Sequence, residues 1–222
     1  MLFRSAFVEA GCRLAATYDV ASVCVRPADV RRARALLEGT DVAVGTTIGF
    51  PHGNHATEVK VHEAKRALAD GATELDMVLQ IGALKSGRDA DVEADIRAVV
   101  EVGHAAGAIV KVIFENAYLT DAEKIRACHL SESAGADFVK TSTGFAPSGA
   151  TLDDLRLMRA NTSERIQIKA AGGVRTLDAL LAVMEVGVTR IGATATEAII
   201  QEFRARKAGV TPAAGGAVVG GH

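Results

Sequence analysis

The stretch GADFVKTSTG, residues 135–144, joins two features that decide the fold: a glycine after a helical pattern, and a short strand pattern directly behind it. The same arrangement recurs at Gly71, before ATELDMV, and at Gly187, before VTRIGAT. Counting five residues onward from each glycine reaches Asp76, Lys140 and Gly192. This shared offset predicts that the three residues lie at similar heights on different strands of a repeating βα unit.

Strand and helix patterns alternate along the rest of the chain. Seven short runs are typical of buried strands, at residues 20–25, 42–49, 74–80, 109–115, 138–144, 166–173 and 190–195. Helical patterns such as 56–70 and 91–106 lie between them, which predicts parallel strands with right-handed crossovers. The predicted class is α/β, as a TIM (β/α) barrel. A doubly wound open sheet is the alternative, but no GxGxxG or Walker sequence supports it.

The number of strands is one short of a closed eight-stranded barrel. Residues 1–19 show a helical pattern with apolar positions, so the usual first strand is predicted to be missing. The length of 222 residues suits one domain, which we expect to span residues 1–208. Residues 209–222, GVTPAAGGAVVGGH, are rich in glycine and alanine and predict a flexible tail.

Composition excludes several classes of function. A formal net charge of −2 and a pI near 6.3 leave no extended basic surface for nucleic acid or an anionic membrane. The three cysteines are odd in number and lack CxxC spacing, which predicts neither a disulfide framework nor structural zinc and fits a reducing cytoplasm. No export signal and no stretch of membrane-spanning length is recognised in the sequence.

Charged residues interrupt four successive predicted strands, which in a parallel barrel are normally almost entirely apolar. They are Asp76, Lys111, Lys140 and Lys169. An ordinary ion pair at a strand end explains one such residue, but four in succession favour convergence inside the barrel. There, one ammonium group beside another depresses a lysine pKa and yields a free amine that can attack an aldehyde.

Six ordered segments carry a resemblance to a known family: VCVRP, GFPHG, ELDMVLQIGALKSG, VKVIFE, FVKTSTG and IKAAGGVR. From about Val20 to Ile200 the chain resembles the deoxyribose-phosphate aldolases, a family of class I aldolases. The resemblance implies that Lys140 forms a Schiff base with the substrate. It also implies that Lys169 lowers the pKa of Lys140 and relays protons, and that Asp76 shuttles protons.

The reaction implied by this resemblance is the reversible cleavage of 2-deoxy-D-ribose 5-phosphate to D-glyceraldehyde 3-phosphate and acetaldehyde, in deoxyribonucleoside catabolism. It requires no metal and no cofactor. Lys111, one strand before Lys140, is expected to pair with Asp76 and tune its charge rather than to touch the substrate. A purely structural ion pair is an equally open interpretation of Lys111.

Residues that follow the last two predicted strands are candidates for binding the substrate phosphate through backbone N–H groups. They are Gly172, Gly173 and Arg175 after IQIKAA, and Gly192 and Thr194 after RI, with Gly144 contributing from the KTSTG turn. For any single glycine, a plain turn is an equally good explanation.

Two departures from the family pattern have consequences. Members usually begin with a strand such as DHTLLKP, and its absence leaves two sheet edges with unpaired backbone groups. A truncated reading frame is the favoured explanation, and the exposed edges together with family habit predict a homodimer. Many members also have two hydroxyl residues where this chain has Thr194 and Ala195, which predicts one weaker phosphate contact.

Three other functions remain open at this stage. His52, His55 and His62 suggest a zinc hydrolase, but surface histidines that bind no metal are favoured. A transaldolase-like enzyme would share the imine chemistry and differ in substrate. An inactive barrel fragment kept as an assembly partner is the third. Cys24 could face the lumen and react with unsaturated aldehydes, but a buried apolar thiol is favoured and predicts no catalytic role.

Overall fold

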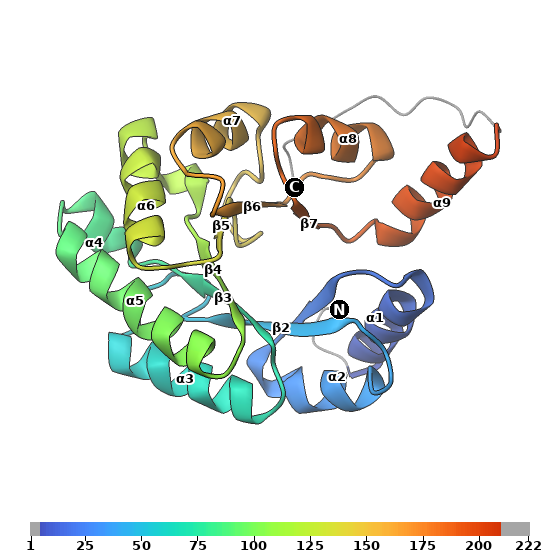
Figure 1. Ribbon diagram of the computed structural model, residues 1–222, viewed down its shortest axis with the longest axis horizontal. Coiled ribbons are helices and arrows are strands. Elements are labelled where there is room, and N and C mark those ends of the chain that lie inside the picture. Colours follow the sequence, from blue (N-terminus) through green and yellow to red (C-terminus); the bar gives the residue numbers. More distant parts are fainter. Residues whose placement is uncertain (1–4, 210–222) are drawn as a thin grey trace.

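The computed structural model describes residues 5–209 as one curled parallel sheet with helices on its outer side (Figure 1). The sheet has seven strands in chain order, each paired in parallel with its neighbours. The strands are β1 (Ser22–Val25), β2 (Ala43–Ile48), β3 (Glu74–Val78), β4 (Ile109–Ile113), β5 (Phe138–Lys140), β6 (Gln167–Ala171) and β7 (Arg190–Gly192). The seven predicted strands and the α/β class are therefore confirmed.

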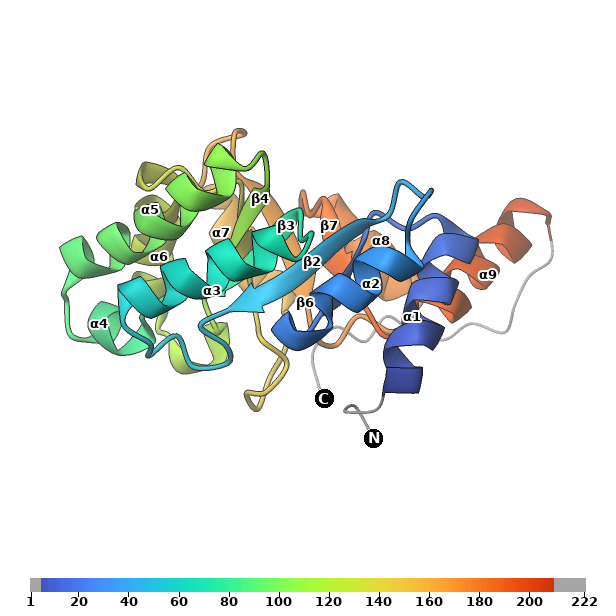
Figure 2. The same ribbon diagram turned by 90° about the horizontal axis from the view of Figure 1, so that it is seen from below.

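Helices connect the strands and cover the convex side of the sheet, in agreement with the predicted crossovers. The α-helices are α1 (Ser5–Tyr18), α2 (Val30–Leu36), α3 (Thr57–Ala69), α4 (Ile81–Lys85), α5 (Asp89–Ala105), α6 (Asp121–Ser133), α7 (Leu152–Ala160), α8 (Leu177–Glu185) and α9 (Thr196–Lys207), with short 3-10 turns at Pro27–Asp29 and Asn116–Tyr118. Figure 2 shows α1, α2 and α3 in succession along the outer side of the first strands. Within residues 5–209, no helix combines the length and apolar character needed to cross a membrane.

Local sequence signals fix several of these boundaries. Thr120 begins α6 with a capping box, in which its side chain accepts from the Glu123 N–H while the Glu123 carboxylate accepts from the Thr120 N–H. The glycines of the repeated junctions adopt left-handed φ values behind α3, α6 and α8: 103° at Gly71, 88° at Gly135 and 90° at Gly187. Glycine tolerates this conformation without steric cost, so each helix ends there and the chain turns into the next strand.

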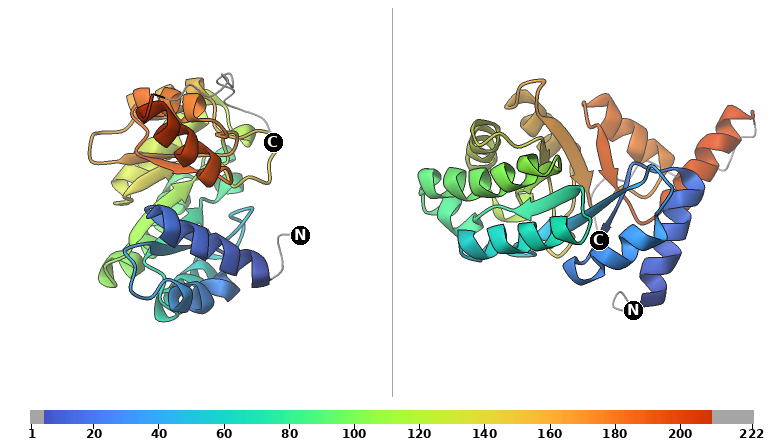
Figure 3. Two further views of the ribbon diagram at one scale, coloured as in Figure 1. Left: turned by 90° about the vertical axis from the view of Figure 1, so that its right-hand side faces the viewer. Right: turned by 60° about the horizontal axis from the view of Figure 1, so that its bottom comes forward.

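The sheet is open between β1 and β7, which are its two edge strands among the described residues. The strand residues of β1 and β7 are partly exposed, whereas those of β3 are all buried. Helices α1 and α9 lie side by side at this opening (Figure 3). The Tyr18 hydroxyl donates to Glu197 Oε1, and the Arg204 guanidinium lies 5.3 Å from the centre of the Tyr18 ring. Side chains thus connect the two ends of the sheet.

The strand register places inward-facing residues in layers. Lys140 pairs with Ile113 of β4, and Ile113 pairs with Val78 of β3, two residues beyond Asp76. An advance of two residues over two strands is the stagger of tilted barrel strands, so Asp76 and Lys140 occupy the same layer. The same stagger applied to β1 and β7 gives a middle layer of Cys24, Asp76, Lys140 and Gly192. The layer below it contains Ser22, Glu74, Phe138 and Arg190. The height predicted from the glycine offset is therefore confirmed.

The last helix ends next to the predicted end of the domain. Helix α9 ends at Lys207, within the predicted domain of residues 1–208. The predicted tail at 209–222 lies outside the described residues except for Gly209, and so do the first four residues of the predicted N-terminal helix. The apolar core that supports the inward-facing polar layers runs through all strands and most helices, with side chains such as Val30, Leu75, Val112, Val139, Leu155 and Ile168 fully buried.

Candidate active site

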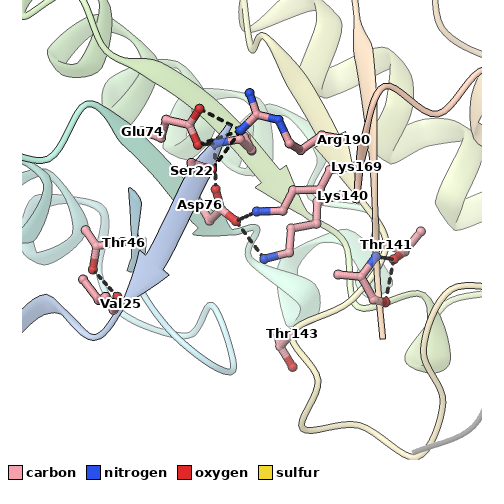
Figure 4. A network of polar contacts seen from close by, with 12 residues as sticks. Ser22, Val25, Thr46, Glu74, Asp76, Lys140, Thr141, Thr143, Lys169 and Arg190 are labelled. Carbon is pink, nitrogen blue, oxygen red and sulfur yellow. Dashed lines mark hydrogen bonds and ion pairs between the residues drawn. The ribbon is translucent and has the colours of Figure 1, made fainter. Parts of the chain in front are cut away.

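The centre of the site is one carboxylate that receives two lysines (Figure 4). Lys140 Nζ donates to Asp76 Oδ2 at 2.7 Å, and Lys169 Nζ donates to the same oxygen at 2.6 Å. Asp76 is 1% exposed, and each lysine is 6% exposed. The three side chains come from β3, β5 and β6, so the predicted convergence of charged residues inside the barrel is observed.

Lys111 of β4 joins this cluster from the other side of Asp76. Its ammonium group lies 3.0 Å from Asp76 Oδ1 and 2.8 Å from Glu74 Oε2, and it is fully buried. The expected contact with Asp76 is therefore present, and a second contact with Glu74 was not foreseen. Both oxygens of Asp76 are occupied by cations, which holds the carboxylate plane in a fixed orientation.

Asp76 carries its negative charge across the physiological range. Burial by itself would raise the pKa of its carboxyl group, but the adjacent Lys140, Lys169 and Lys111 ammonium groups lower that pKa well below 3.8. A buried carboxylate in contact with three cations gains more from their attraction than it loses in hydration. Asp76 is consequently a stable anion that accepts hydrogen bonds from both neighbouring lysines.

The two lysines that share Asp76 differ in the direction of their pKa shifts. Burial lowers the pKa of Lys169, and the Lys140 ammonium group lowers it further. Burial also disfavours the Lys140 cation, but Asp76 and the nearby Glu115 carboxylate outweigh it and raise the Lys140 pKa. The sequence predicted a depressed pKa at Lys140. The pKa is instead lowered at Lys169, where the Lys140 and Lys111 ammonium groups add to the effect of burial.

Glu115 is a residue of this site that the sequence argument did not single out. It follows β4, is almost fully buried and has a φ of 59°, an uncommon left-handed value for a residue with a side chain. Its carboxylate accepts from the Thr143 N–H at 3.2 Å and from the Thr143 hydroxyl. A charged residue closing the apolar run IVKVIF was the available signal. Glu115 holds the turn that follows Lys140.

The candidate phosphate residues lie in loops at the carboxyl ends of the last strands. Gly172 and Gly173 have φ values of 82° and 84°, and Ala171 at the end of β6 pairs with Gly192 at the end of β7. Gly172 lies against Gly149, because a Cβ on Gly172 would be 2.8 Å from Gly149 Cα. Arg175 and Thr194 are exposed beyond the same strands, and Gly144 is exposed in the turn after β5.

Gly192 occupies a special place in this arrangement. It is the member of the middle layer that has no side chain, and it follows Lys140 in the order of the layer. A Cβ at Gly192 would lie 3.7 Å from the Lys169 Cε. The layer is therefore open on the side where Lys169 and the β6 and β7 loops meet, which is where a bound substrate could extend from the amines toward the loop glycines.

The remaining sequence candidates are the three histidines and Cys24. His52, His55 and His62 are exposed, and residues 5–209 contain no group of three histidine, cysteine or acidic side chains that could hold a metal ion. Cys24 does face the middle layer, but the expectation that it is buried was wrong. Its side chain is exposed, because β1 is an edge strand with no partner on its outer side among the described residues.

Comparisons with known proteins identify the family of this chain. The family model of the DeoC/LacD family aldolases matches residues 2–220. The chain is 49% identical over 197 residues to the deoxyribose-phosphate aldolase of Rhodopirellula baltica, covering 89% of this chain and 82% of that protein. It is 54% identical over 187 residues to the deoxyribose-phosphate aldolase of Staphylococcus epidermidis, covering 84% of each.

A solved structure shows the same fold. It is described as a tetrameric deoxyribose phosphate aldolase from Aeropyrum pernix, and it superimposes with a TM-score of 0.82 at 29% sequence identity, covering 90% of this chain and 84% of that one. With a family match over almost its full length and relatives near half identity, this chain belongs to the DeoC/LacD family of aldolases.

Proposed function

We propose that this protein cleaves 2-deoxy-D-ribose 5-phosphate reversibly to D-glyceraldehyde 3-phosphate and acetaldehyde through a Schiff base on Lys140. The observation that carries the proposal is the pair of buried lysines on one oxygen of Asp76. Two ammonium groups in contact with one carboxylate oxygen cannot both keep their protons as easily as isolated lysines do, so the pair readily supplies one neutral amine. The names of the similar proteins indicate the substrate class.

Proton transfer within the pair prepares the nucleophile. Because the Lys169 pKa is lowered, Lys169 loses its proton more readily than Lys140 and can then take the proton of Lys140 directly or through Asp76. Lys140 then attacks C1 of the open-chain aldehyde, and loss of water from the carbinolamine gives a protonated imine. Lys169 serves as the base in this step, and Asp76 holds both amines in place.

Carbon–carbon cleavage follows from the imine. A base removes the proton of the C3 hydroxyl group, the bond between C2 and C3 breaks, and its electron pair moves into the protonated imine to give an enamine. D-glyceraldehyde 3-phosphate is released from the C3 side. Protonation of the enamine carbon and addition of the water lost earlier then release acetaldehyde and regenerate the Lys140 amine. Asp76 and Lys169 are the groups placed to exchange these protons.

The position of the two amines favours Lys140 as the nucleophile. In Figure 4 its nitrogen lies on the side of the turn that carries Thr143, whereas the Lys169 nitrogen lies on the side of Glu74 and Arg190. Substrates of parallel barrels enter from the carboxyl ends of the strands, which is the side of that turn. Glu115 supports this assignment, since it fixes Thr143 next to the entry.

The phosphate group would be held at the loops after β6 and β7. We assign it to the backbone N–H groups around Gly172, Gly173 and Gly192, with Arg175, Thr194 and Gly144 at the periphery. Two successive left-handed glycines leave the backbone accessible, as anion sites in loops require. This placement puts the aldehyde end of the substrate over Lys140 and the phosphate at the rim.

Two alternative functions follow from the same features. A different class I sugar-phosphate aldolase would use the same lysines with another substrate. The open edge between β1 and β7 is the feature that favours the second alternative, an inactive barrel that serves as an assembly partner. Comparison of deoxyribose 5-phosphate with fructose phosphates as substrates separates the first alternative, and folded protein without turnover would favour the second.

We further propose that the active form is a homodimer in the cytoplasm. The partly exposed β1 and β7 strands offer surface that a second copy could cover. Cys12, Cys24 and Cys128 are all free thiols, which suits a reducing compartment. Light scattering during gel filtration measures the mass directly, and a monomer at micromolar concentration would contradict the dimer.

Trapping of the imine tests the proposed function. The protein is incubated with acetaldehyde and sodium borohydride, digested, and mapped by mass spectrometry. We expect a reduced two-carbon adduct on Lys140, with loss of turnover of 2-deoxy-D-ribose 5-phosphate in parallel. The Lys140→Met variant should remain folded, form no adduct at this site and show no turnover. An adduct confined to Lys169, or turnover by Lys140→Met, would overturn the assignment.

A further inference from the structure

The layer below the amines consists of polar, charged and aromatic side chains from the odd-numbered strands. Arg190 of β7 crosses the interior and donates from Nη1 to Glu74 of β3, 2.9 Å from Oε1 and 3.1 Å from Oε2. The Phe138 ring lies against two cations, 5.7 Å from Lys111 Nζ and 5.7 Å from the Arg190 guanidinium carbon. Arg190, Glu74 and Phe138 thus form a floor under the active site.

Glu74 connects this floor to the reacting groups through Lys111. Glu74 Oε2 and Asp76 Oδ1 accept the same Lys111 ammonium group at 2.8 and 3.0 Å. The contacts form a continuous alternation of charge from Arg190 through Glu74, Lys111 and Asp76 to the two catalytic lysines. Any change in how Glu74 holds Lys111 therefore changes how strongly Lys111 acts on Asp76.

Arg190 has one more contact, and it spans the open side of the sheet. The same Nη1 donates to Ser22 Oγ at 2.9 Å, so the side chain joins the two edge strands β1 and β7 at the level of the floor (Figure 4). The Arg190 side chain is 20% exposed, and the Glu74 side chain is 4% exposed. The positive charge of Arg190 consequently acts on Glu74 across little water, so dissolved salt screens this ion pair only weakly.

We propose that Glu74 and Arg190 are positioning residues that set the protonation of the Lys140 and Lys169 pair through Lys111. This inference rests on the proposed function, since it concerns the amine that performs the chemistry. Neither residue contacts the reacting atoms. Glu74 shares the positive charge of Lys111 and leaves Asp76 available for the catalytic amines, while Arg190 offsets the negative charge of Glu74 and fixes its orientation.

The charged groups that face the two amines can be named element by element. Asp76 and Glu74 come from β3, Lys111 from β4 and Glu115 from the turn after β4, and Arg190 comes from β7. Cys24 faces them from β1. Glu74 and Arg190 carry opposite charges within one ion pair, so their removal must change the field at the amines in opposite directions.

Opposite shifts in pH dependence are the expected signature. Glu74→Gln removes a negative charge, disfavours the ammonium forms and should move the acid limb of the kcat/KM profile to lower pH by roughly 0.5–1 unit. Arg190→Met removes a positive charge, favours the ammonium forms and should move that limb to higher pH by a similar amount. The double variant should lie close to the unmodified protein.

Two control variants separate charge from structure. Arg190→Lys keeps the positive charge and should leave the acid limb near its original position. Ser22→Ala removes the contact across the open edge without changing any charge, and it should lower stability slightly without moving the limb. If Glu74→Gln does not fold, the comparison of Arg190→Met with Arg190→Lys still decides the case.

A readout independent of turnover completes the experiment. The rate of reductive trapping of acetaldehyde on Lys140 is measured from pH 5 to 9 for each variant by mass spectrometry. Absence of any Lys140 adduct in the unmodified protein would refute the proposed function itself. Normal trapping in the unmodified protein, with shifts that are absent or equal in sign for Glu74→Gln and Arg190→Met, would refute this inference alone. Opposite shifts in both assays would support it.

Discussion

Lys140 and Lys169 donate to the same oxygen atom, Oδ2 of Asp76, at 2.7 and 2.6 Å. Neighbouring strands bring the two lysines into register, because β5 and β6 pair Lys140 directly with Lys169. Two cations on one acceptor share a single counter-charge, so their titrations are linked and one proton leaves more readily than from a solitary lysine. This relationship underlies the first two predictions.

Replacing Lys169 should remove the base that deprotonates Lys140. In Lys169→Leu, Lys140 no longer shares Asp76 Oδ2 with a second ammonium group. Lys140 therefore remains protonated to higher pH. We expect kcat to fall by about 10²–10⁴-fold at neutral pH and part of the activity to return as the pH rises. Steady-state kinetics from pH 6 to 10 measures both. Unchanged kcat at neutral pH would contradict the role of Lys169.

Replacing Asp76 should affect stability as well as rate. Asp76→Asn leaves Lys140, Lys169 and Lys111 around a neutral amide, and loss of one partner from a buried ion pair costs about 3–5 kcal/mol of unfolding free energy. Urea unfolding at pH 7 measures this difference. Asp91→Asn, which breaks an exposed pair with Arg88, is the control and should have a much smaller effect.

The same variant carries a pH signature. The pKa of Asp76 in the folded protein lies well below 3.8, so its stabilising contribution is complete above that ordinary value and is lost as the pH falls toward the folded pKa. The stability difference between the unmodified protein and Asp76→Asn should therefore be constant near neutrality and narrow below pH 3.8. A difference that widens with acid would show that Asp76 is not the paired anion described above.

The assignment of the phosphate loop is open to a selective test. A Cβ at Gly172 would lie 2.8 Å from Gly149 Cα, so Gly172→Ala should displace the loop after β6. We expect KM for deoxyribose 5-phosphate to rise at least roughly tenfold, or ~1.4 kcal/mol, with little change for unphosphorylated deoxyribose. Gly107→Ala is a matched control, since Gly107 has a φ of 72° and open space around it. Equal effects on both substrates would argue against phosphate binding there.

A second buried ion pair joins α3 to α5 and to the end of β3. Lys60 Nζ donates to Asp95 Oδ2 at 2.6 Å and to the Val78 carbonyl at 2.8 Å, and both charged side chains are fully buried. Lys60→Met should lower the free energy of unfolding by about 3–5 kcal/mol, because it leaves the buried Asp95 carboxylate without its cation. Adding Asp95→Leu should recover part of that loss. Denaturant unfolding of the single and double variants checks this, and a double variant less stable than the single one would contradict the explanation.

Treatment with a metal chelator should leave the activity intact. The imine chemistry proposed for Lys140 uses no metal ion. The histidines that suggested a zinc site, His52, His55 and His62, are exposed. Dialysis against EDTA followed by assay, with readdition of zinc as the control, measures the effect. Loss of activity on dialysis with recovery on zinc addition would require a different mechanism.

Periodic features of the sequence predicted the central framework of the fold. The charged residues that interrupt apolar strand patterns and the repeated glycine offset predicted Asp76 and Lys140 in one layer, which the strand register confirms. Strand ends were predicted less well. The run 166–173 was assigned to one strand, but β6 ends at Ala171 because Gly172 adopts a φ of 82°, outside the extended region.

Contacts across the interior could not be predicted from local patterns. Arg190 and Glu74 are separated by 116 positions, and their contact depends on the tilt of the strands and the curl of the whole sheet. The direction of the Lys140 pKa shift was missed for a related reason. It depends first on Asp76 and then on Cys24 and Glu115, which are distant in the sequence and come together only in the folded interior.

The opening between β1 and β7 has a consequence for the motions of the molecule. Inner strands are held by backbone ladders on both sides, whereas each of these two is held by such a ladder on one side among the described residues. Their amide hydrogens should exchange with deuterium earlier than those of β3 and β4, which are protected by two neighbours. The contact between Arg190 and Ser22 spans this opening. Local opening of the edge strands would therefore break that contact, shift the Arg190 charge and change the reactivity of the amines above it.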